Sequence, residues 1–204
     1  GESSYKVNQF FISHSSLNYD TGNTLPASGF DPSHITLSDI QIQLDSIRYK
    51  GKEIQALLRT GSAKERSGLS FNSLVGEIVS DSTVFQIPHL ALQTPYSHLN
   101  LQANIPWSTI EETPQGNLLS TLSASIGKED LFSFIGTLPE EFKQAYPNRP
   151  LKISTRIEGN ISKLSLKEFK GELSQAFNFH LSGEMKAVTD SIRRSGELQT
   201  ACQP

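Results

Sequence analysis

A short apolar cadence occurs three times in this chain, at 35–44, 69–78 and 164–173. In every copy, apolar residues occupy the first, third, sixth and tenth positions, and a Ser or Thr occupies the second. The fourth and fifth positions are always polar. Repetition of this kind is typical of a sheet assembled from similar units. It favours a surface or groove over a catalytic centre.

The stretches between the copies alternate apolar and polar residues with a period of two. Lys50-Gly51 predicts a tight hairpin turn between strands at 40–49 and 54–58. The same alternation recurs at 85–87, 90–92, 99–105, 122–126, 151–157 and 177–181. Strands with one apolar and one polar face are typical of an antiparallel sheet with one covered face. None of these stretches resembles the continuous Val/Ile runs of a parallel sheet.

All three copies of the cadence change parity at their polar pair, which is Ser38-Asp39, Asn72-Ser73 or Lys167-Glu168. A β-bulge there would add one residue, restore the apolar face and increase the local twist. A two-residue turn is the alternative. We favour the bulge because Gly is missing from all three pairs. Bulges in every copy would make the sheet coil.

One segment has a helical period. Leu131, Phe134, Ile135 and Leu138 are spaced as on one face of a helix, behind an acidic first turn. Pro139 fits the start of a second short helix with Phe142 and Ala145 as its apolar contacts, and Pro147 would end it. The sequence therefore predicts one helical hairpin, at 128–147, inserted in a β protein.

The composition limits the function classes. Lys and Arg number 18 against 21 Asp and Glu, and a net charge of −3 gives no positive footprint for a nucleic acid. No apolar run approaches the roughly 20 residues that span a bilayer. The lone Cys202 provides no disulfide framework. With Gly1 as its first residue and Met185 as its single Met, we expect the chain to be a piece of a longer protein.

The sequence carries little sign of catalytic or metal chemistry. The five histidines form no H-x-x-x-H or H-E-x-x-H pair, although His89 and His98 lie on two predicted strands that could meet. No phosphate-binding glycine loop and no G-x-S-x-G elbow are present. The adjacent acids at 111–112 and 140–141 would not converge on one substrate. We therefore expect no catalytic residue, no metal, no cofactor and no small-molecule substrate.

The apolar face remains as the candidate site. Its residues could fill the core of a closed sandwich or barrel, which is the usual fate of alternating strands. Alternatively, an open and strongly curved sheet could keep this face accessible, although something apolar would then have to lie along it. Composition by itself favours the closed core.

Four phrases, taken in order, resemble the TamB branch of the AsmA-like family in its Bacteroides-type form. They are E-R-S-G-L at 65–69 followed by the cadence, L-A-L-Q-T-P-Y-S at 90–97, A-S-I-G-K-E-D-L at 124–131 and I-E-G-N at 157–160. The resemblance covers roughly residues 30–190. It implies a long, U-shaped β-sheet folded into a trough lined by apolar side chains.

The resemblance also implies a function and a location. Members form a bridge that is anchored in the inner membrane, crosses the periplasm and meets an Omp85-type barrel in the outer membrane. Their proposed roles are phospholipid transport between the membranes and help with outer-membrane protein assembly. The inner-membrane anchor and the barrel-binding region would lie outside this chain, and the family has no catalytic residues to carry over.

We therefore predict a mainly β fold, an elongated and strongly curved antiparallel sheet (a U-shaped β trough) with one helical hairpin. The expected regions are an N-terminal strand and loop (1–29), trough repeats (30–127), the hairpin (128–147), more trough (148–190) and a polar tail (191–204). We expect the hairpin to interrupt the trough. The predicted groove residues, which would contact phospholipid acyl chains, are Ile40, Ile42, Leu44, Leu74, Leu99, Leu101, Phe177 and Phe179.

Two other functions stay open from the sequence. The chain could be a β-sandwich binding module of a secreted or surface protein, with the loops at 21–29 and 111–117 as its contact region. It could instead be a scaffold that binds client β-strands at an open sheet edge through backbone hydrogen bonds.

Overall fold

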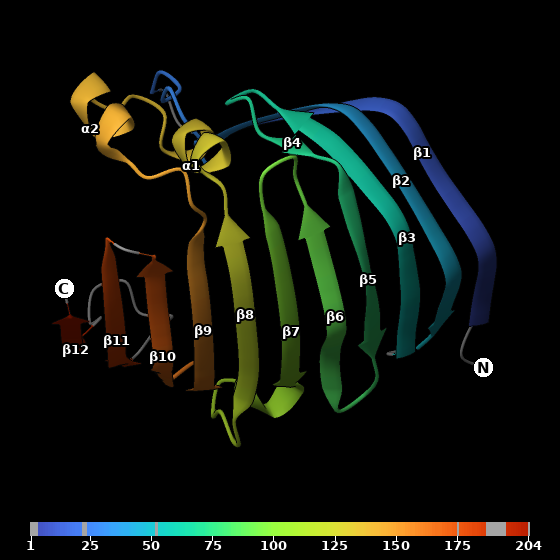
Figure 1. The fold of residues 1–204 in the computed structure, drawn as a ribbon. Helices are drawn as coiled ribbons and strands as arrows, with labels where there is room; N and C mark the ends of the chain where they lie inside the picture. The colour runs from blue at the N-terminus through green and yellow to red at the C-terminus, as the bar shows by residue number, and fades with distance from the viewer. Residues whose placement is uncertain (1–3, 22–23, 52, 175, 187–194, 204) are drawn as a thin grey trace.

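The structure, a computed structural model, is described here for residues 4–21, 24–51, 53–174, 176–186 and 195–203. It is mainly β, and its strands form one open antiparallel sheet rather than two facing sheets (Figure 1). Neighbours in the sheet follow the chain order from β1 to β12, except that β3 pairs with β5 and the short β4 pairs only with β3. The strands are β1 (Ser4–Asp20), β2 (His34–Lys50), β3 (Glu53–Glu65), β4 (Ser70–Phe71), β5 (Ser73–Ser80), β6 (Val84–Gln93), β7 (His98–Pro106), β8 (Leu118–Ile126), β9 (Leu151–Asn160), β10 (Lys163–Leu173), β11 (Phe177–Lys186) and β12 (Ser195–Gln203).

The sheet is an elongated, strongly curved trough, which confirms the predicted fold class. The long strands β1 to β3 curve over at the end where the helices lie, whereas β5 to β9 run straighter (Figure 1). The chain exposes 13188 Å² of surface. A compact monomer of its mass, 22.5 kDa, would expose about 9,500 Å². The excess reflects a sheet that is not closed on itself.

Bulges produce the parity change in two copies of the cadence. In the first copy the register with β1 and β3 shifts around Asp39, whose φ of 52° is in the left-handed region. In the third copy the register shifts between Leu166 and Glu168 against β9. Both shifts fall at the predicted polar pairs, so the bulge is confirmed there over the two-residue turn.

The second copy uses a strand break at the same position. β4 ends at Phe71 and β5 begins at Ser73, and the Asn72 N–H donates to the Gln93 carbonyl instead of continuing the ladder with β3. At the break, one residue leaves the ladder with the neighbouring strand. The apolar residues before and after it can therefore lie on the same face, as they do at a bulge.

The predicted helices are present as α1 (Lys128–Ile135) and α2 (Glu140–Ala145), with a 3-10 turn, η1 (Trp107–Thr109), after β7. Gly136 ends α1 with a φ of 86°, a conformation that glycine adopts without steric cost. The helices lie beyond one end of β8 and β9 (Figure 1).

The expectation that the hairpin interrupts the trough is wrong. β8 and β9 are consecutive in the chain around the hairpin, yet they pair directly from Leu118↔Gly159 to Ile126↔Leu151 without a register shift. The hairpin is a long connection at the strand ends, and the sheet passes beneath it unbroken.

Hydrogen bonds and ring contacts attach α1 to two other parts of the chain. The Thr94 and Ser97 hydroxyls of the β6–β7 turn both donate to the buried Asp130 carboxylate. The Phe30 N–H donates to the Phe134 carbonyl at 2.8 Å, and the two rings stack 5.3 Å apart. Helix α1 therefore joins the β1–β2 connection to the ends of the central strands.

A strand of the sheet lies at each end of the described chain. The N-terminal region contains β1, which is a full member of the sheet. The region expected to be a polar tail contains β12, which pairs with β11 from Asn178↔Gln203 to Lys186↔Ser195. Few apolar residues mark β12 in the sequence, so its strand pattern was weak.

Candidate functional site: the apolar face of the trough

The strand register places the apolar residues of all the long strands on one face, called the apolar face below. Paired residues of an antiparallel ladder share a face, so an unbroken set of pairs defines a row across the sheet. The central row is Phe10, Leu44, Leu58, Gly76, Leu90, Leu101, Leu122, Thr155, Phe169 and Leu181. Only Thr155 brings a polar side chain into it.

A second row runs beside the first. Its members are Ile12, Ile42, Gly61, Leu74, Leu92, Leu99, Ala124, Ile153, Gly171 and Phe179. Neighbouring strands lie about 4.8 Å apart, so a row of ten strands is about 43 Å long along the sheet. The two rows make a continuous apolar strip that crosses the strands.

All eight groove residues predicted from the sequence lie on the apolar face. Leu44 and Leu101 belong to the central row, and Ile42, Leu74, Leu99 and Phe179 belong to the second row. Ile40 pairs with Ser15, and Phe177 pairs with Leu173, farther toward the helix end. Seven of the eight are half-buried and Phe177 is exposed, so none of them lies in a sealed core.

The apolar face is the inner face of the trough. Buried strand positions lie on it, including Gly61, Gly76, Ala124, Gly171 and Leu173. The glycines let neighbouring side chains cover the strand: the Phe179 ring lies against Gly171, in the space that a Cβ would need. An aromatic ring over a strand glycine replaces the packing that the glycine lacks.

The opposite, outer face is polar and carries most of the charges. Ion pairs there include Lys163–Glu184 and Lys170–Glu168, each 2.9 Å between nitrogen and oxygen. The hydrogen bond from Lys170 holds the pKa of the Glu168 carboxyl below its ordinary value, and Lys163 does the same for Glu184. These are exposed pairs of the kind that solubilise a sheet face rather than form a site.

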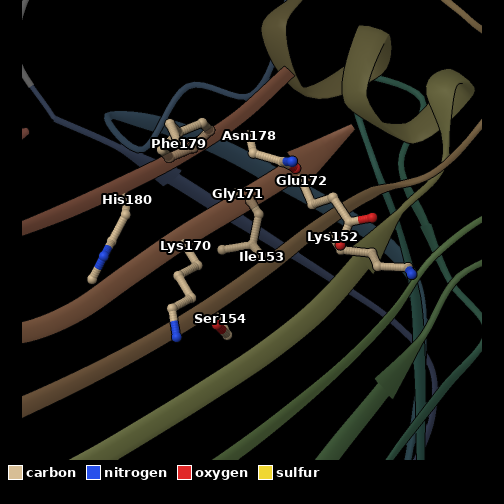
Figure 2. A pocket seen from close by; sticks show the side chains of 9 residues that line it. All are labelled: Lys152, Ile153, Ser154, Lys170, Gly171, Glu172, Asn178, Phe179 and His180. Atoms are coloured by element: carbon tan, nitrogen blue, oxygen red, sulfur yellow. The ribbon is translucent and has the colours of Figure 1, made fainter. Parts of the chain in front are cut away.

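A hollow on the outer face spans β9, β10 and β11 (Figure 2). Ser154, Lys170 and His180 form one cross-strand line in it. Lys152, Glu172 and Asn178 form the next. Lys152 and Glu172 bring charges of both signs to the hollow, and Lys170 forms an ion pair with Glu168, so the charges largely offset one another.

The bend of β1 to β3 has its own charge cluster. Asp39 lies 3.3 Å from the Lys64 Nζ and 3.5 Å from the His14 Nδ1, and His14 also has a positive φ, of 50°. The hydrogen bond and charge of Lys64, with a smaller contribution from His14, lower the pKa of the Asp39 carboxyl. The bulges on adjacent strands are therefore joined by charge-assisted hydrogen bonds.

Within the described ranges, no group of three or more His, Cys, Asp or Glu side chains is placed to hold a metal ion. His89 pairs with Glu77, and His98 pairs with Gln93 and Ser125. The two predicted strand histidines are exposed on the outer face and are not neighbours in the register. His34 is buried, and its two ring nitrogens contact Asp20 at 3.0 Å and Thr24 at 3.2 Å, which ties down the β1–β2 connection.

The predicted groove residues lie on β2, β5, β7 and β11, and they leave out the members of the strip on β1, β3, β6, β8, β9 and β10. On β1, Phe10-x-Ile12 has the same alternation as Ile42-x-Leu44, which was a signal for this strand. A search for partners of each cadence residue by hairpin register would have found them.

Comparison of the chain with protein-family models, with curated proteins and with solved structures returns no match. No helix in the described part of the chain is long and apolar enough to cross a membrane.

Proposed function

We propose that this chain is a segment of a periplasm-spanning bridge whose apolar face carries phospholipid acyl chains between the inner and outer membranes. The full-length protein would be anchored in the inner membrane and would reach an Omp85-type outer-membrane barrel through regions outside this chain. The resemblance to the TamB branch suggests the location and the partner. The observation that carries the proposal is the continuous apolar strip across ten strands of an open sheet.

The length of the strip favours a conduit over a single-ligand pocket. A bilayer core about 30 Å thick holds two layers of acyl chains, so one chain extends about 15 Å. The strip of about 43 Å would hold several chains end to end. Its half-buried Leu, Ile and Phe side chains offer no hydrogen-bonding pattern that would select one lipid position over the next.

The energetics are consistent with transport along this surface. Each CH₂ exposed to water costs about 0.8 kcal/mol, so a lipid that leaves a bilayer faces a large barrier. A trough that contacts one side of the chain removes part of this cost at every step. Because adjacent positions are chemically alike, the lipid would meet no deep minimum along the way.

Native mass spectrometry and lipid extraction of the purified chain test the proposal. We expect phospholipid to be recovered, and Leu101→Asp combined with Leu122→Asp to abolish it by placing two charges on the central row. Gln102→Asp combined with Thr121→Asp is the matched control, since these paired residues lie on the outer face of the same strands. A wild-type chain free of lipid would contradict the proposal.

A cellular test examines the transport role. In the full-length protein, Ile42→Asp or Leu101→Asp should weaken the outer-membrane barrier while the protein still accumulates to normal levels. Normal barrier function in both variants would argue against transport along this face.

A second candidate function is a scaffold for client β-strands, which the open edge of the sheet favours. β1 is 17 residues long, and among the described strands it pairs only with β2, so its other side offers backbone groups to a further strand. A client bound there would be displaced by edge substitutions and not by those on the apolar face. The sandwich interpretation has no such support, because the described strands form a single sheet.

A further inference from the structure

The end of the trough opposite the helices carries a basic and aromatic cluster, called the basic rim below. It consists of Tyr5 and Lys6 on β1 with Arg48, Tyr49 and Lys50 on β2. These residues line one hollow together with parts of β3 and β5. In the ladder Lys6 pairs with Arg48, Tyr5 with Tyr49, and Ser4 with Lys50.

The two kinds of side chain lie on opposite faces of the rim. Tyr49 pairs with Ile54 of β3 beyond a register shift near Ser46, whose φ of 53° is in the left-handed region, and this shift returns Tyr49 to the apolar face. The Tyr5 ring stacks on Tyr49 with their centroids 6.3 Å apart, and the two residues are 62% and 44% exposed. Lys6 is next to Tyr5 on β1 and Arg48 is next to Tyr49 on β2. Successive side chains of a strand point to opposite faces, so both cations point to the outer face. Ile54, which is exposed and pairs with Tyr49, continues the apolar face from the tyrosines onto β3.

The cations of the basic rim are not used in ion pairs. Among the residues that the structure describes, none of Lys6, Arg48 and Lys50 forms one. Two acids line the same hollow, Glu53 and Asp81. Asp81 is engaged elsewhere, since its Oδ1 accepts hydrogen bonds from the Thr83 hydroxyl and from the Thr83 and Val84 N–H groups. Its negative charge remains, so among the described residues that line the hollow two acids face three cations.

We propose that the basic rim binds the phosphate of an anionic phospholipid whose acyl chains lie on the adjacent apolar face. An amphipathic ligand needs an apolar surface and a charged group within one molecule's reach, and the rim provides both on neighbouring residues. Arg48 presents a fork of donors that suits phosphate oxygens, and the lysines add point charges. Tyrosine is favoured where an apolar region meets a polar one. The inference rests on the proposed acyl-chain function and adds a lipid class to it.

Monomeric lipids test the proposal without a bilayer. Short-chain phosphatidylglycerol and phosphatidylcholine with identical acyl chains would be titrated into the 204-residue chain below their micelle concentrations. Binding is measured by calorimetry and by the emission of Trp107, the single tryptophan. Trp107 lies beside the rim hollow, because its Nε1–H donates to the Asp81 carbonyl at 2.8 Å.

We expect the chain to bind phosphatidylglycerol roughly fivefold more tightly than phosphatidylcholine. Each basic side chain near an anionic headgroup contributes on the order of fivefold, and Glu53 and Asp81 oppose two of the three cations. The triple variant Lys6→Gln, Arg48→Gln, Lys50→Gln should abolish this preference and leave phosphatidylcholine binding unchanged. The matched control is Arg149→Gln, Lys152→Gln, Lys167→Gln, which removes three exposed cations far along the sheet and should keep the preference. Arg48→Lys alone, which keeps the charge, should lose part of it.

Several results would overturn the proposal. Equal affinity of the wild-type chain for both lipids would do so while leaving the acyl-chain function intact. Loss of the preference in the control triple would show that net charge, and not the rim, is responsible. Inorganic phosphate that binds as tightly as phosphatidylglycerol would show a free-anion site. If neither lipid binds, the proposed function itself fails.

Discussion

At the scale of single residues, glycines determine where the apolar face is hollow and where it is filled. The Phe179 ring occupies the space over Gly171, so a methyl group at 171 would collide with it. We expect Gly171→Ala to lower the free energy of unfolding by about 1 kcal/mol, as overpacking does, measured by urea denaturation. In a Phe179→Ala background the same change should become neutral or stabilising, because Ala is less costly than Gly in a strand. Additive effects would contradict the ring contact.

Asp39 gives a residue-scale prediction with a definite pH dependence. Its pKa is lowered in the folded chain by Lys64, so its contribution to stability is present above the ordinary Asp pKa of about 4 and is lost as pH falls through the lower folded value. Asp39→Asn removes the charge but tolerates the positive φ of the bulge.

The test compares urea unfolding of the wild-type chain and Asp39→Asn from pH 7 to pH 2.5. We expect the wild type to be more stable at pH 7 and the difference to disappear near the acidic end. A difference that does not change with pH would show that the side chain acts through its shape rather than its charge.

At the scale of elements, Asp130 is the main attachment of α1 to the sheet. Asp130 is 7% exposed, and its carboxylate accepts hydrogen bonds from the hydroxyls of Thr94 and Ser97. Asp130→Ala would leave both part-buried hydroxyls without their acceptor. We expect a loss of about 2–3 kcal/mol in the free energy of unfolding and faster hydrogen exchange at the β6–β7 turn.

The neighbouring Glu129 is the control for this prediction. It is exposed, so Glu129→Ala should change stability by less than about 0.5 kcal/mol. Similar destabilisation in both variants would indicate a loss of helix propensity or dipole interaction instead of the hydrogen bonds to the turn.

The elements also show how far the sequence could predict this fold. Alternation identified the strands and their apolar side, because burial on one face requires a period of two. The polar pairs of the cadence located the bulges near Asp39 and Glu168. Only an extra residue at each pair keeps the following apolar residue, Ile40 or Phe169, on the apolar face. The sequence predicted where the helical hairpin lies in the chain but not where it lies in the fold. Its helical pattern shows which side is apolar, but it does not show which strand ends that side packs against. β12 was missed because few apolar residues mark it.

The candidate site was predicted in part. All eight predicted groove residues share the apolar face, yet the rows that join them depend on the register between strands, which the sequence specifies only through the short Lys50-Gly51 turn. The basic rim was not foreseen. Tyr5 and Tyr49 are 44 positions apart in the chain, and only the β1–β2 pairing brings them together.

At the scale of the whole molecule, the open sheet is nearly one-dimensional. The substantial contacts between strands join only neighbours in the sheet order. In such an architecture, stability is approximately a sum of strand terms and nearest-neighbour terms. The edge strands should therefore open before the centre of the sheet does.

Hydrogen exchange measured strand by strand tests this property, with two truncations in the same central row. Phe10 lies on the edge strand β1 and Leu122 on the central β8, and both contribute apolar surface to the trough. We expect Phe10→Ala to raise exchange only in β1 and β2, because the edge has one neighbour to disturb. Leu122→Ala should raise exchange across β6 to β10, because a weakened centre divides the row into two shorter sheets. If both variants raised exchange uniformly, the sheet would unfold as one cooperative unit, and the strip would be held together by contacts across the trough instead of along it.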